Sequence, residues 1–352
     1  MTYEITVQAS KNSKINQVDF HNIPFGKIFT DHMLLCEYAD GDWKSAEILP
    51  FQNISVSPAM SALHYGQEIF EGMKAYKNPE GKAGIFRPEM NHRRMNRSAH
   101  RMCMPEIPEE LFINGLNELI RMDSAWIPTT EGASLYIRPF MVATDEFVGI
   151  RPSETYKFII FCSPVGAYYT EPIKVKIEEH YTRAARGGVG SAKNAGNYGA
   201  SLYPAALAAK EGFKQILWTD DVEHRWIEES GTMNVFFVIG DKIITPSLDG
   251  NILDGVTRDS VITLFSDKGA TVEERPISIE EVLTAHQNGE LKEAFGAGTA
   301  ATIAQITDIG YQGSLLSLHP IAARKYSTWV LEQLEGIKRG TLEDKFSWMH
   351  WL

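Results

Sequence analysis

The sequence predicts an α/β (α+β) protein of two domains, from its length, its mixture of strand and helix patterns, and an irregular stretch near its middle. At 352 residues the chain is longer than one ordinary domain of about 150 residues. Strand-like and helix-like patterns occur in both halves, which indicates two mixed domains with a ligand site between them. We expect a small N-terminal α/β domain at residues 1–162, an interdomain linker at residues 163–171, and a larger C-terminal domain at residues 172–352.

The first half combines apolar strands with two helices that begin at prolines. Residues 133–137 and 156–161 are apolar enough to form strands. Pro88 stands where the first turn of a helix tolerates proline, so we expect a helix from there to about residue 103. Pro108 opens a second expected helix, which ends near Met122.

The second half repeats this mixture with shorter elements. Three apolar or alternating stretches are expected to form strands: residues 173–177, 214–218 and 235–239. Ser278 precedes Glu281 with the spacing of a capping box, which predicts a helix that ends near Gly289. A further helix is expected from Pro320 to about Lys338.

Composition narrows the class of protein. A net charge of −11 argues against nucleic acid and anionic membranes as partners, because both require a basic surface. Cys36, Cys103 and Cys162 have apolar neighbours and no metal-binding spacing, so we expect buried thiols and no metal site. The chain has neither a basic-then-apolar leader nor an apolar run of about 20 residues, so we expect a cytoplasmic protein.

Lys193 lies in the most informative segment, residues 187–199, which contains five glycines. Such a backbone lets a flat ligand approach closely, and a lysine there suits Schiff-base chemistry with an aldehyde. A P-loop requires Gly before the lysine and Ser or Thr after it, whereas this chain has Ala192 and Asn194. A surface lysine in a flexible loop is the alternative.

Three further features suit a phosphorylated aromatic aldehyde. Residues 255–257 and 296–300 contain glycine and threonine in patterns that favour phosphate binding by backbone N–H groups, although glycine before a helix is also common. Glu229 precedes an apolar strand, where it is either a solvated turn residue or a partner for a pyridinium nitrogen. One arginine of residues 93–101 could bind the phosphate. Pyridoxal phosphate carries an aldehyde for Lys193, a ring nitrogen for Glu229, and a phosphate for the glycine–threonine segments and the arginine.

These motifs resemble the branched-chain amino-acid aminotransferases, which are class IV, fold-type IV pyridoxal-phosphate enzymes. The similarity covers nearly the whole chain, and the matching segments follow in order: residues 25–33, 63–65, 70–77, 135–139, the lysine loop, 229–234 and 295–300. The resemblance implies a two-domain fold-type IV enzyme with its cofactor at the domain interface.

The resemblance also implies roles for individual residues. Lys193 would be the Schiff-base lysine and proton shuttle, Tyr198 would lie near the ring oxygen, and Glu229 would pair with the pyridine nitrogen. The remaining cofactor contacts would come from Arg94, Thr232, Val256, Thr257 and Thr299. The substrate pocket would be formed by Phe25, Tyr65, Phe70, Tyr136, Arg138, Ile150, Tyr168, Thr232 and Ala300.

The implied reaction is a ping-pong amino transfer between L-leucine, L-isoleucine or L-valine and 2-oxoglutarate. Arg138 would read the distal carboxylate of glutamate, Tyr168 would belong to a flexible lid, and Ile150 would reach the neighbouring subunit's pocket in a homodimer. Animal members carry a Cys-x-x-Cys pair where this chain has Ala301 and Ala304, so thiol regulation is not expected.

Two other classes of function stay open from the sequence. One is another fold-type IV enzyme, such as a D-amino-acid aminotransferase or an aminodeoxychorismate lyase. The other is a phosphate-ligand binding protein without catalytic activity.

Overall fold

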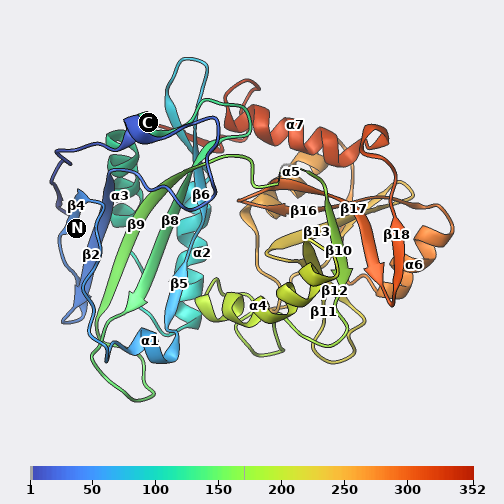
Figure 1. Ribbon diagram of the computed structural model, residues 1–352, viewed down its shortest axis with the longest axis horizontal. Helices are drawn as coiled ribbons and strands as arrows, with labels where there is room; N and C mark the ends of the chain where they lie inside the picture. The colour runs from blue at the N-terminus through green and yellow to red at the C-terminus, as the bar shows by residue number, and fades with distance from the viewer. Residues whose placement is uncertain (1–2, 170) are drawn as a thin grey trace. The chain divides into compact units, whose positions relative to one another are not determined.

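The computed structural model describes residues 3–169 and 171–352, which form two units (Figure 1). Unit 1 consists of Met1–Tyr168, Ala192–Ala195 and Gly336–Leu352, and unit 2 consists of Tyr169–Ser191 and Gly196–Glu335. Each unit contains a β-sheet with helices, so the predicted mixed α/β fold class is confirmed.

Within the described residues, unit 1 is built on a ten-stranded sheet of order β1-β4-β2-β9-β8-β6-β7-β19, with β3 paired to β2 and β5 to β8. Its strands are β1 (Ile5–Val7), β2 (His32–Ala39), β3 (Asp42–Trp43), β4 (Ala46–Pro50), β5 (Glu68–Phe70), β6 (Met73–Lys77), β7 (Ala83–Phe86), β8 (Ser134–Ala143), β9 (Tyr156–Val165) and β19 (Met349–Trp351).

A break between β5 and β6 positions part of the site. Both strands pair with β8, β6 at residues 135–137 and β5 at residues 140–142. Pro139 lies between these two pairings, and its carbonyl accepts from the Glu71 N–H at 2.7 Å. Glu71 and Gly72 are therefore the two residues at which the chain leaves one pairing and begins the next.

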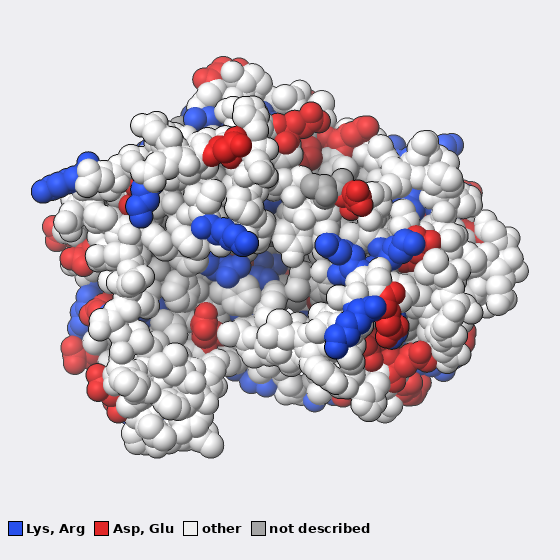
Figure 2. Space-filling view, viewed as in Figure 1, with Lys and Arg blue, Asp and Glu red and all other residues white. Residues whose placement is uncertain are grey.

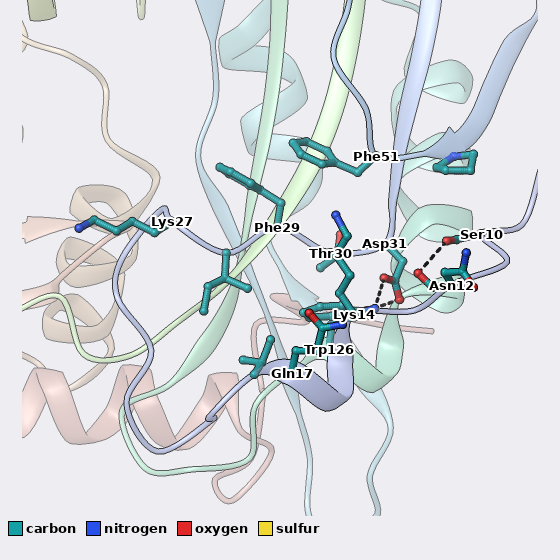
Figure 3. A pocket seen from close by; sticks show the side chains of 13 residues that line it. Ser10, Asn12, Lys14, Gln17, Lys27, Phe29, Thr30, Asp31, Phe51 and Trp126 are labelled. Carbon is teal, nitrogen blue, oxygen red and sulfur yellow. Dashed lines mark hydrogen bonds between the residues drawn. The ribbon is translucent and has the colours of Figure 1, made fainter.

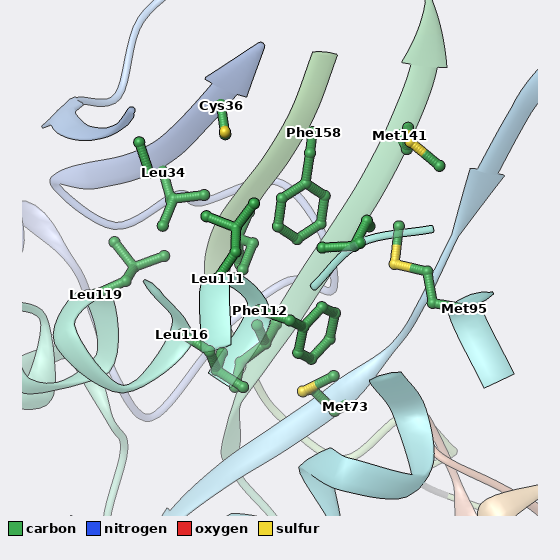
Figure 4. Close-up of a cluster of buried hydrophobic side chains, with 14 of the residues drawn as sticks. Leu34, Cys36, Met73, Met95, Leu111, Phe112, Leu116, Leu119, Met141 and Phe158 are labelled. Carbon is green, nitrogen blue, oxygen red and sulfur yellow. The ribbon is translucent and has the colours of Figure 1, made fainter. Parts of the chain in front are cut away.

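The helices of unit 1 cover its apolar sheet face. They are α1 (Ser61–Tyr65), α2 (Pro88–Arg101) and α3 (Glu109–Met122), with short 3-10 turns at Ile15–Gln17 and Ser124–Trp126. The helix α3 contacts β2 and β4, and α2 contacts α3 and β5. Leu111, Phe112 and Leu116 of α3 are fully buried, and the Phe112 ring stacks on Phe158 of β9 at 5.8 Å (Figure 4).

In unit 2 the strand pairings close on themselves. The nine strands of its described residues are β10 (Ile173–Ile177), β11 (Gln215–Thr219), β12 (Ile227–Ser230), β13 (Met233–Ile239), β14 (Lys242–Thr245), β15 (Val272–Glu274), β16 (Leu291–Gly298), β17 (Thr302–Tyr311) and β18 (Ser314–Ser317). Their order is β12-β11-β10-β17-β16-β13-β14-β15, with β18 on β17, and β12 also pairs with β13. The strands β10, β11, β12, β13, β16 and β17 therefore form a ring, and closing a sheet removes exposed edges.

Unit 2 contains four helices among its described residues, and one of them begins at the capping box predicted from the sequence. They are α4 (Ala195–Lys210), α5 (Val256–Asp267), α6 (Ile279–Gln287) and α7 (Tyr326–Lys338), with a 3-10 turn at Ile321–Ala323. The first residue of α4 and the last three of α7 belong to unit 1. The Ser278 hydroxyl accepts from the Glu281 N–H at 3.1 Å, as the capping-box spacing predicts.

Some expectations about local structure were wrong. The helix expected from Pro320 begins only at Tyr326, because Arg324 after the short 3-10 turn is extended and interrupts the helix. Cys103 is exposed, because it lies beyond α2 in a turn with a left-handed backbone (φ 53°) rather than in the core. Cys36 and Cys162 are buried, as expected.

The units differ from the predicted domain boundaries. The strand β9 runs to Val165 and pairs with β8 there, so the predicted linker at residues 163–171 begins inside a strand. Residue 170 of that linker and residues 1–2 lie outside the described residues. Residues 336–352 belong to unit 1, because Met349–Trp351 pairs with Ala83–Phe86.

Two further observations concern the surface and the helices. Acidic and basic side chains are intermixed on the face shown in Figure 2.

Every helix in the described part of the chain is too short or too polar to cross a bilayer.

Candidate active site

The backbone of Lys193 is held between a strand and a helix of unit 1. Its carbonyl accepts from the Phe70 N–H at 3.0 Å, and its own N–H donates to the Ser98 hydroxyl of α2 at 2.9 Å. The next residue, Asn194, forms an antiparallel bridge with Ile69. Although the surrounding loop is rich in glycine, Lys193 itself is fixed by hydrogen bonds on both sides of its main chain.

The side chain of Lys193 is partly buried beside an aromatic ring. Its Nζ atom lies 4.9 Å from the centroid of the Phe70 ring. A half-buried lysine on an aromatic face is a different environment from the flexible surface loop that the sequence left open.

Arg94 forms a buried ion pair with Glu71, a residue of the break between β5 and β6. Its Nε donates to Glu71 Oε1 and its Nη2 to Oε2, both at 2.7 Å, in the two-bond geometry typical of strong arginine–carboxylate pairs. The side chain of Arg94 is 5% exposed and that of Glu71 is 0% exposed. The other arginines of this segment, Arg93, Arg97 and Arg101, are exposed.

Hydrogen bonds and charge decide the ionisation of Glu71. Burial alone would raise its pKa, but the Arg94 charge and hydrogen bonds, the Lys193 charge and the Asn91 amide together lower the pKa below its ordinary value. Glu71 is therefore a carboxylate inside the core of unit 1.

Five of the residues expected in the substrate pocket come together in unit 1. The Arg138 guanidinium lies over the Phe70 ring at 4.7 Å and donates to the Tyr136 hydroxyl at 2.9 Å. The Phe25 ring meets the rings of Tyr136 and Tyr168 edge-on, at 5.3 and 4.9 Å. Gly72 is required here, because a Cβ atom at that position would lie 2.3 Å from the Tyr136 hydroxyl. Aromatic faces with one arginine among them can receive both an apolar and an anionic group.

Tyr65 and Ile150 are not part of this cluster. Tyr65 is 43% exposed at the end of α1, where its ring contacts His64, and Ile150 is 94% exposed in the loop after β8. The cluster therefore contains Phe25, Phe70, Tyr136, Arg138 and Tyr168 of the residues expected from unit 1.

In unit 2, Glu229 lies inside β12 rather than just before an apolar strand. It pairs with Asn234 of β13 across the hairpin, and its side chain is almost fully buried. Its Oε1 accepts from the Leu253 N–H at 2.7 Å and lies 3.3 Å from Nη2 of Arg183. Glu229 is thus a fixed carboxylate and not a solvated turn residue.

The neighbour of Glu229 in the strand is a second buried carboxyl group. Glu228 Oε1 accepts from the Asn251 amide at 3.2 Å, and among the described residues its Oε2 has no hydrogen-bond partner. Burial raises the pKa of Glu228 to about 7, against the opposing effects of the Asn251 amide and the Arg183 charge. The charge of Arg183 therefore acts on both carboxyl groups, by an ion pair with Glu229 and by lowering the pKa of Glu228. Arg183 also donates to the carbonyls of Asn251 and Gly190.

Val256 and Thr257 open helix α5 and are both 5% exposed. Gly255 is the N-cap residue, and no side chain of the described residues caps this helix. The first N–H groups of a helix lack intrahelical acceptors and attract anions, so this end of α5 suits a phosphate.

The remaining expected residues of unit 2 lie at turns or early in a helix. Thr232 is exposed in the hairpin turn between β12 and β13, and Tyr198 lies in the first turn of α4. Thr299 and Ala300 form the turn after β16, so residues 296–300 are the end of a strand and a turn, not a helix N-terminus. Asn234 connects these parts, because it pairs with Glu229 and Ala297 and donates to the Leu253 carbonyl.

Cavities of the described residues lie apart from the expected site residues. One, of about 330 Å³ in unit 1, is lined by Phe29, Phe51, Asp31 and Trp126 among others (Figure 3). Another, of about 250 Å³ in unit 2, includes Glu228 and Asn251. Neither is lined by a residue expected from the sequence, so the candidate site rests on the side-chain contacts above.

The chain also matches a known protein family. The model of the amino-transferase class IV family matches residues 68–309, which include Phe70, Arg94, Lys193, Glu229 and Thr299. This chain belongs to the class IV aminotransferases.

Curated relatives of this class IV aminotransferase match it over nearly its whole length. "Branched-chain-amino-acid aminotransferase 2" of Bacillus subtilis is 44% identical over 99% of this chain and 96% of its own. The branched-chain-amino-acid aminotransferase of Mycolicibacterium smegmatis is 41% identical over 98% of this chain and 97% of its own. The resemblance found in the sequence motifs is therefore confirmed.

Solved structures show the same fold. A branched-chain aminotransferase from Thermoproteus uzoniensis, crystallised with norvaline, has a TM-score of 0.75, with 25% identity, over 91% of this chain and 99% of its own. The Escherichia coli branched-chain amino acid aminotransferase has a TM-score of 0.74, with 25% identity, over 91% and 98%.

Several polar residues of this aminotransferase were missed by the sequence reasoning. They are Glu71, Asn91 and Ser98 in unit 1, and Arg183, Glu228 and Asn234 in unit 2. Glu71 stands alone among Ile69, Phe70 and Met73, and a carboxylate in an apolar segment requires a cationic partner. That signal could have led to the pairing with Arg94.

Proposed function

We propose that this class IV aminotransferase is a branched-chain-amino-acid transaminase that uses pyridoxal 5'-phosphate. It transfers the amino group reversibly between L-leucine, L-isoleucine or L-valine and 2-oxoglutarate, in two half-reactions. The observation that carries the proposal is the placement of Lys193 beside Phe70, which connects the lysine to the aromatic cluster around Arg138. The names of the relatives agree with this substrate class.

The residues present fit this cofactor. Val256, Thr257 and Thr299, with Arg94, would hold the phosphate, and the uncapped N-terminus of α5 is the observation that supports a dianion there. Tyr198, Glu229 and Thr232 would hold the ring. When bound, pyridoxal phosphate supplies an aldehyde for the amino group and a ring that accepts electrons from the substrate's Cα.

Lys193 and Glu229 would handle the protons. Lys193 would hold the cofactor through its aldehyde and would carry the proton that leaves the substrate's Cα. Glu229, buried and held by Leu253 and Arg183, would favour a proton on the pyridine nitrogen if it pairs with that nitrogen.

The aromatic cluster explains how one pocket can accept two kinds of side chain. Phe25, Phe70 and Tyr136 offer apolar faces to a branched side chain, and Ala300 together with Tyr65 would complete the walls. Arg138 would bind the distal carboxylate of glutamate, because a guanidinium matches the two oxygens of a carboxylate. Tyr168, which contacts Phe25, would belong to the lid over this pocket.

The proposal includes an assembly and a location. We propose a cytoplasmic homodimer in which Ile150 of one subunit enters the pocket of its neighbour. The 94% exposure of Ile150 supports this role, because a large apolar side chain so exposed is available to a partner surface.

Absorption spectroscopy tests the proposal directly. The purified protein should be yellow, L-leucine should bleach that colour, and 2-oxoglutarate should restore it. A response to D-alanine but not to L-leucine would instead favour a D-amino-acid aminotransferase. A colourless protein that takes up no pyridoxal phosphate would favour a binding protein without catalytic activity.

A further inference from the structure

Both carboxylate oxygens of Glu71 accept hydrogen bonds, and the proposed mechanism gives this residue no role. Its Oε1 accepts from Arg94 Nε, and its Oε2 accepts from Arg94 Nη2 and from the Asn91 amide, each at 2.7 Å. The Gly72 N–H adds a fourth donor at 3.2 Å. A carboxylate that contacts two nitrogens of a guanidinium fixes the plane of that group as well as its position.

Residues next to this pair are hydrogen-bonded to the backbone of Lys193. Phe70, which precedes Glu71, donates its N–H to the Lys193 carbonyl. Ser98 accepts from the Lys193 N–H and donates to the Arg94 carbonyl at 3.1 Å. Strand β5, helix α2 and the lysine loop therefore meet in one hydrogen-bond network that contains both the Glu71–Arg94 pair and the backbone of Lys193.

The contact geometry fixes the orientation of the Arg94 guanidinium. Glu71 engages the edge that carries Nε and Nη2, and this two-point contact sets the direction of Nη1. Charge points to the same arrangement. Arg94 and Lys193 contribute two positive charges, and Glu71 reduces their sum to one within a buried region.

We propose that Glu71 is a positioning residue that orients the Arg94 guanidinium toward the phosphate of pyridoxal phosphate. This inference rests on the proposed function, in which Arg94 binds that phosphate. Glu71 touches neither the cofactor nor the substrate in this role and acts through Arg94. A purely structural ion pair is the competing explanation.

Binding of two forms of the cofactor separates these explanations. The apo-protein is titrated with pyridoxal phosphate and with phosphate-free pyridoxal, for the wild type, Glu71→Gln, Arg94→Gln and the double variant. Glu71→Gln should weaken pyridoxal phosphate by about tenfold or more and leave pyridoxal within about twofold, since the lost contacts involve a charged group. The double variant should bind no more weakly than Arg94→Gln alone, because residues that act through one another are not additive.

Two further variants control for charge and for folding. Glu89→Gln removes a carboxylate from α2, the helix that carries Arg94, at a side chain that is 42% exposed. This variant should bind both compounds like the wild type. Glu71→Asp keeps the charge but shortens the side chain, so it should lose part of the preference for pyridoxal phosphate. Should Glu71→Gln fail to fold, wild-type preference in Glu71→Asp would overturn the proposal.

The remaining outcomes are also decisive. Equal weakening of both compounds by Glu71→Gln, or losses that add in the double variant, would show that the pair only supports the fold. A wild-type protein that binds neither compound would remove the proposed function and this inference together. Normal wild-type binding with equal losses would remove the role of Glu71 alone.

Discussion

Each unit buries carboxyl groups beside an arginine, but the ratio of carboxyl groups to cations differs between the two units. In unit 1 one carboxylate, Glu71, faces two cations, Arg94 and Lys193. In unit 2 two neighbouring carboxyl groups, Glu228 and Glu229, depend on one cation, Arg183. The first arrangement leaves a positive excess suited to a phosphate, whereas in the second the single cation pairs with Glu229 and burial favours the protonated form of Glu228.

The comparison shows that burial alone does not set the ionisation of a carboxyl group. Glu71 and Glu228 are both nearly inaccessible to solvent, at 0% and 3% exposure. Glu71 has donors on both oxygens and its pKa is lowered, whereas burial raises the pKa of Glu228 to about 7. The number of donors and the sign of the neighbouring charges account for the difference.

The largest expected effect on activity comes from replacing Lys193, the cation of unit 1 that is proposed to react with the cofactor. Lys193→Ala should remove the colour of the protein and lower turnover of L-leucine by about 10⁴-fold, because the cofactor's anchor and the proton carrier are lost together. Lys210→Ala, at the exposed end of α4, is the matched control and should behave like the wild type. Normal leucine turnover in Lys193→Ala would refute the assignment.

The corresponding change in unit 2 is Glu229→Gln. The amide keeps an oxygen for the Leu253 N–H, so the fold should persist, while proton transfer in a single turnover should slow by about 10²-fold or more. Stopped-flow absorbance with L-leucine measures that rate. A rate close to that of the wild type would mean that Glu229 does not hold the ring nitrogen protonated.

Glu71→Gln should lower the free energy of unfolding, because Arg94 and Lys193 would no longer face a carboxylate. Removing one partner leaves the Arg94 charge buried without compensation, which costs about 3–5 kcal/mol. Urea unfolding at neutral pH provides the measurement. The double variant with Arg94→Gln should recover most of the loss, and a double variant as unstable as the single one would contradict the explanation.

Glu228→Gln, unlike Glu71→Gln, should increase the stability of the folded protein at high pH. The folded protein raises the pKa of Glu228 from 4.5 to about 7, so the protonated form is favoured on folding. That contribution is complete below about pH 4.5 and is lost as the pH rises through about 7; it is on the order of 3 kcal/mol. Unfolding curves measured across this pH range should show that the free energy of unfolding falls less with pH in Glu228→Gln than in the wild type. The same fall in both proteins would contradict the raised pKa of Glu228.

The smallest effect is expected at the far end of the aromatic cluster. Arg138→Ala should raise the KM for glutamate by about tenfold and change that for L-leucine much less, because only glutamate carries a distal carboxylate. Steady-state kinetics with both amino acids tests the difference. Equal losses would indicate that Arg138 mainly supports the Phe70 and Tyr136 rings.

Local sequence signals predicted much of this protein. Pro88 and Ser278 marked helix starts correctly, and the alternating residues 173–177 form β10 with the expected bounds. These features depend on neighbours within a few positions, so they can be inferred from the sequence alone. The family was likewise predictable, because its motifs are contiguous.

The features that escaped prediction depend on distant residues. The closed ring of unit 2 requires the pairing of β12 with β13 and of β10 with β17, which no periodicity reveals. Glu71 and Arg94 are 23 positions apart and meet only because the β5–β6 break turns inward beside α2. Cys103 is exposed because a turn follows α2, although its neighbours in sequence are apolar.

The pairing of β19 with β7 has a consequence for how the chain is made. On the ribosome, Ala83–Phe86 emerges well before any of unit 2, yet its antiparallel partner follows all of it. One edge of the first sheet therefore stays open during translation of the intervening residues, and exposed edges recruit foreign strands. A nascent chain stalled before Met349 should be more susceptible to aggregation and chaperone capture than the released protein.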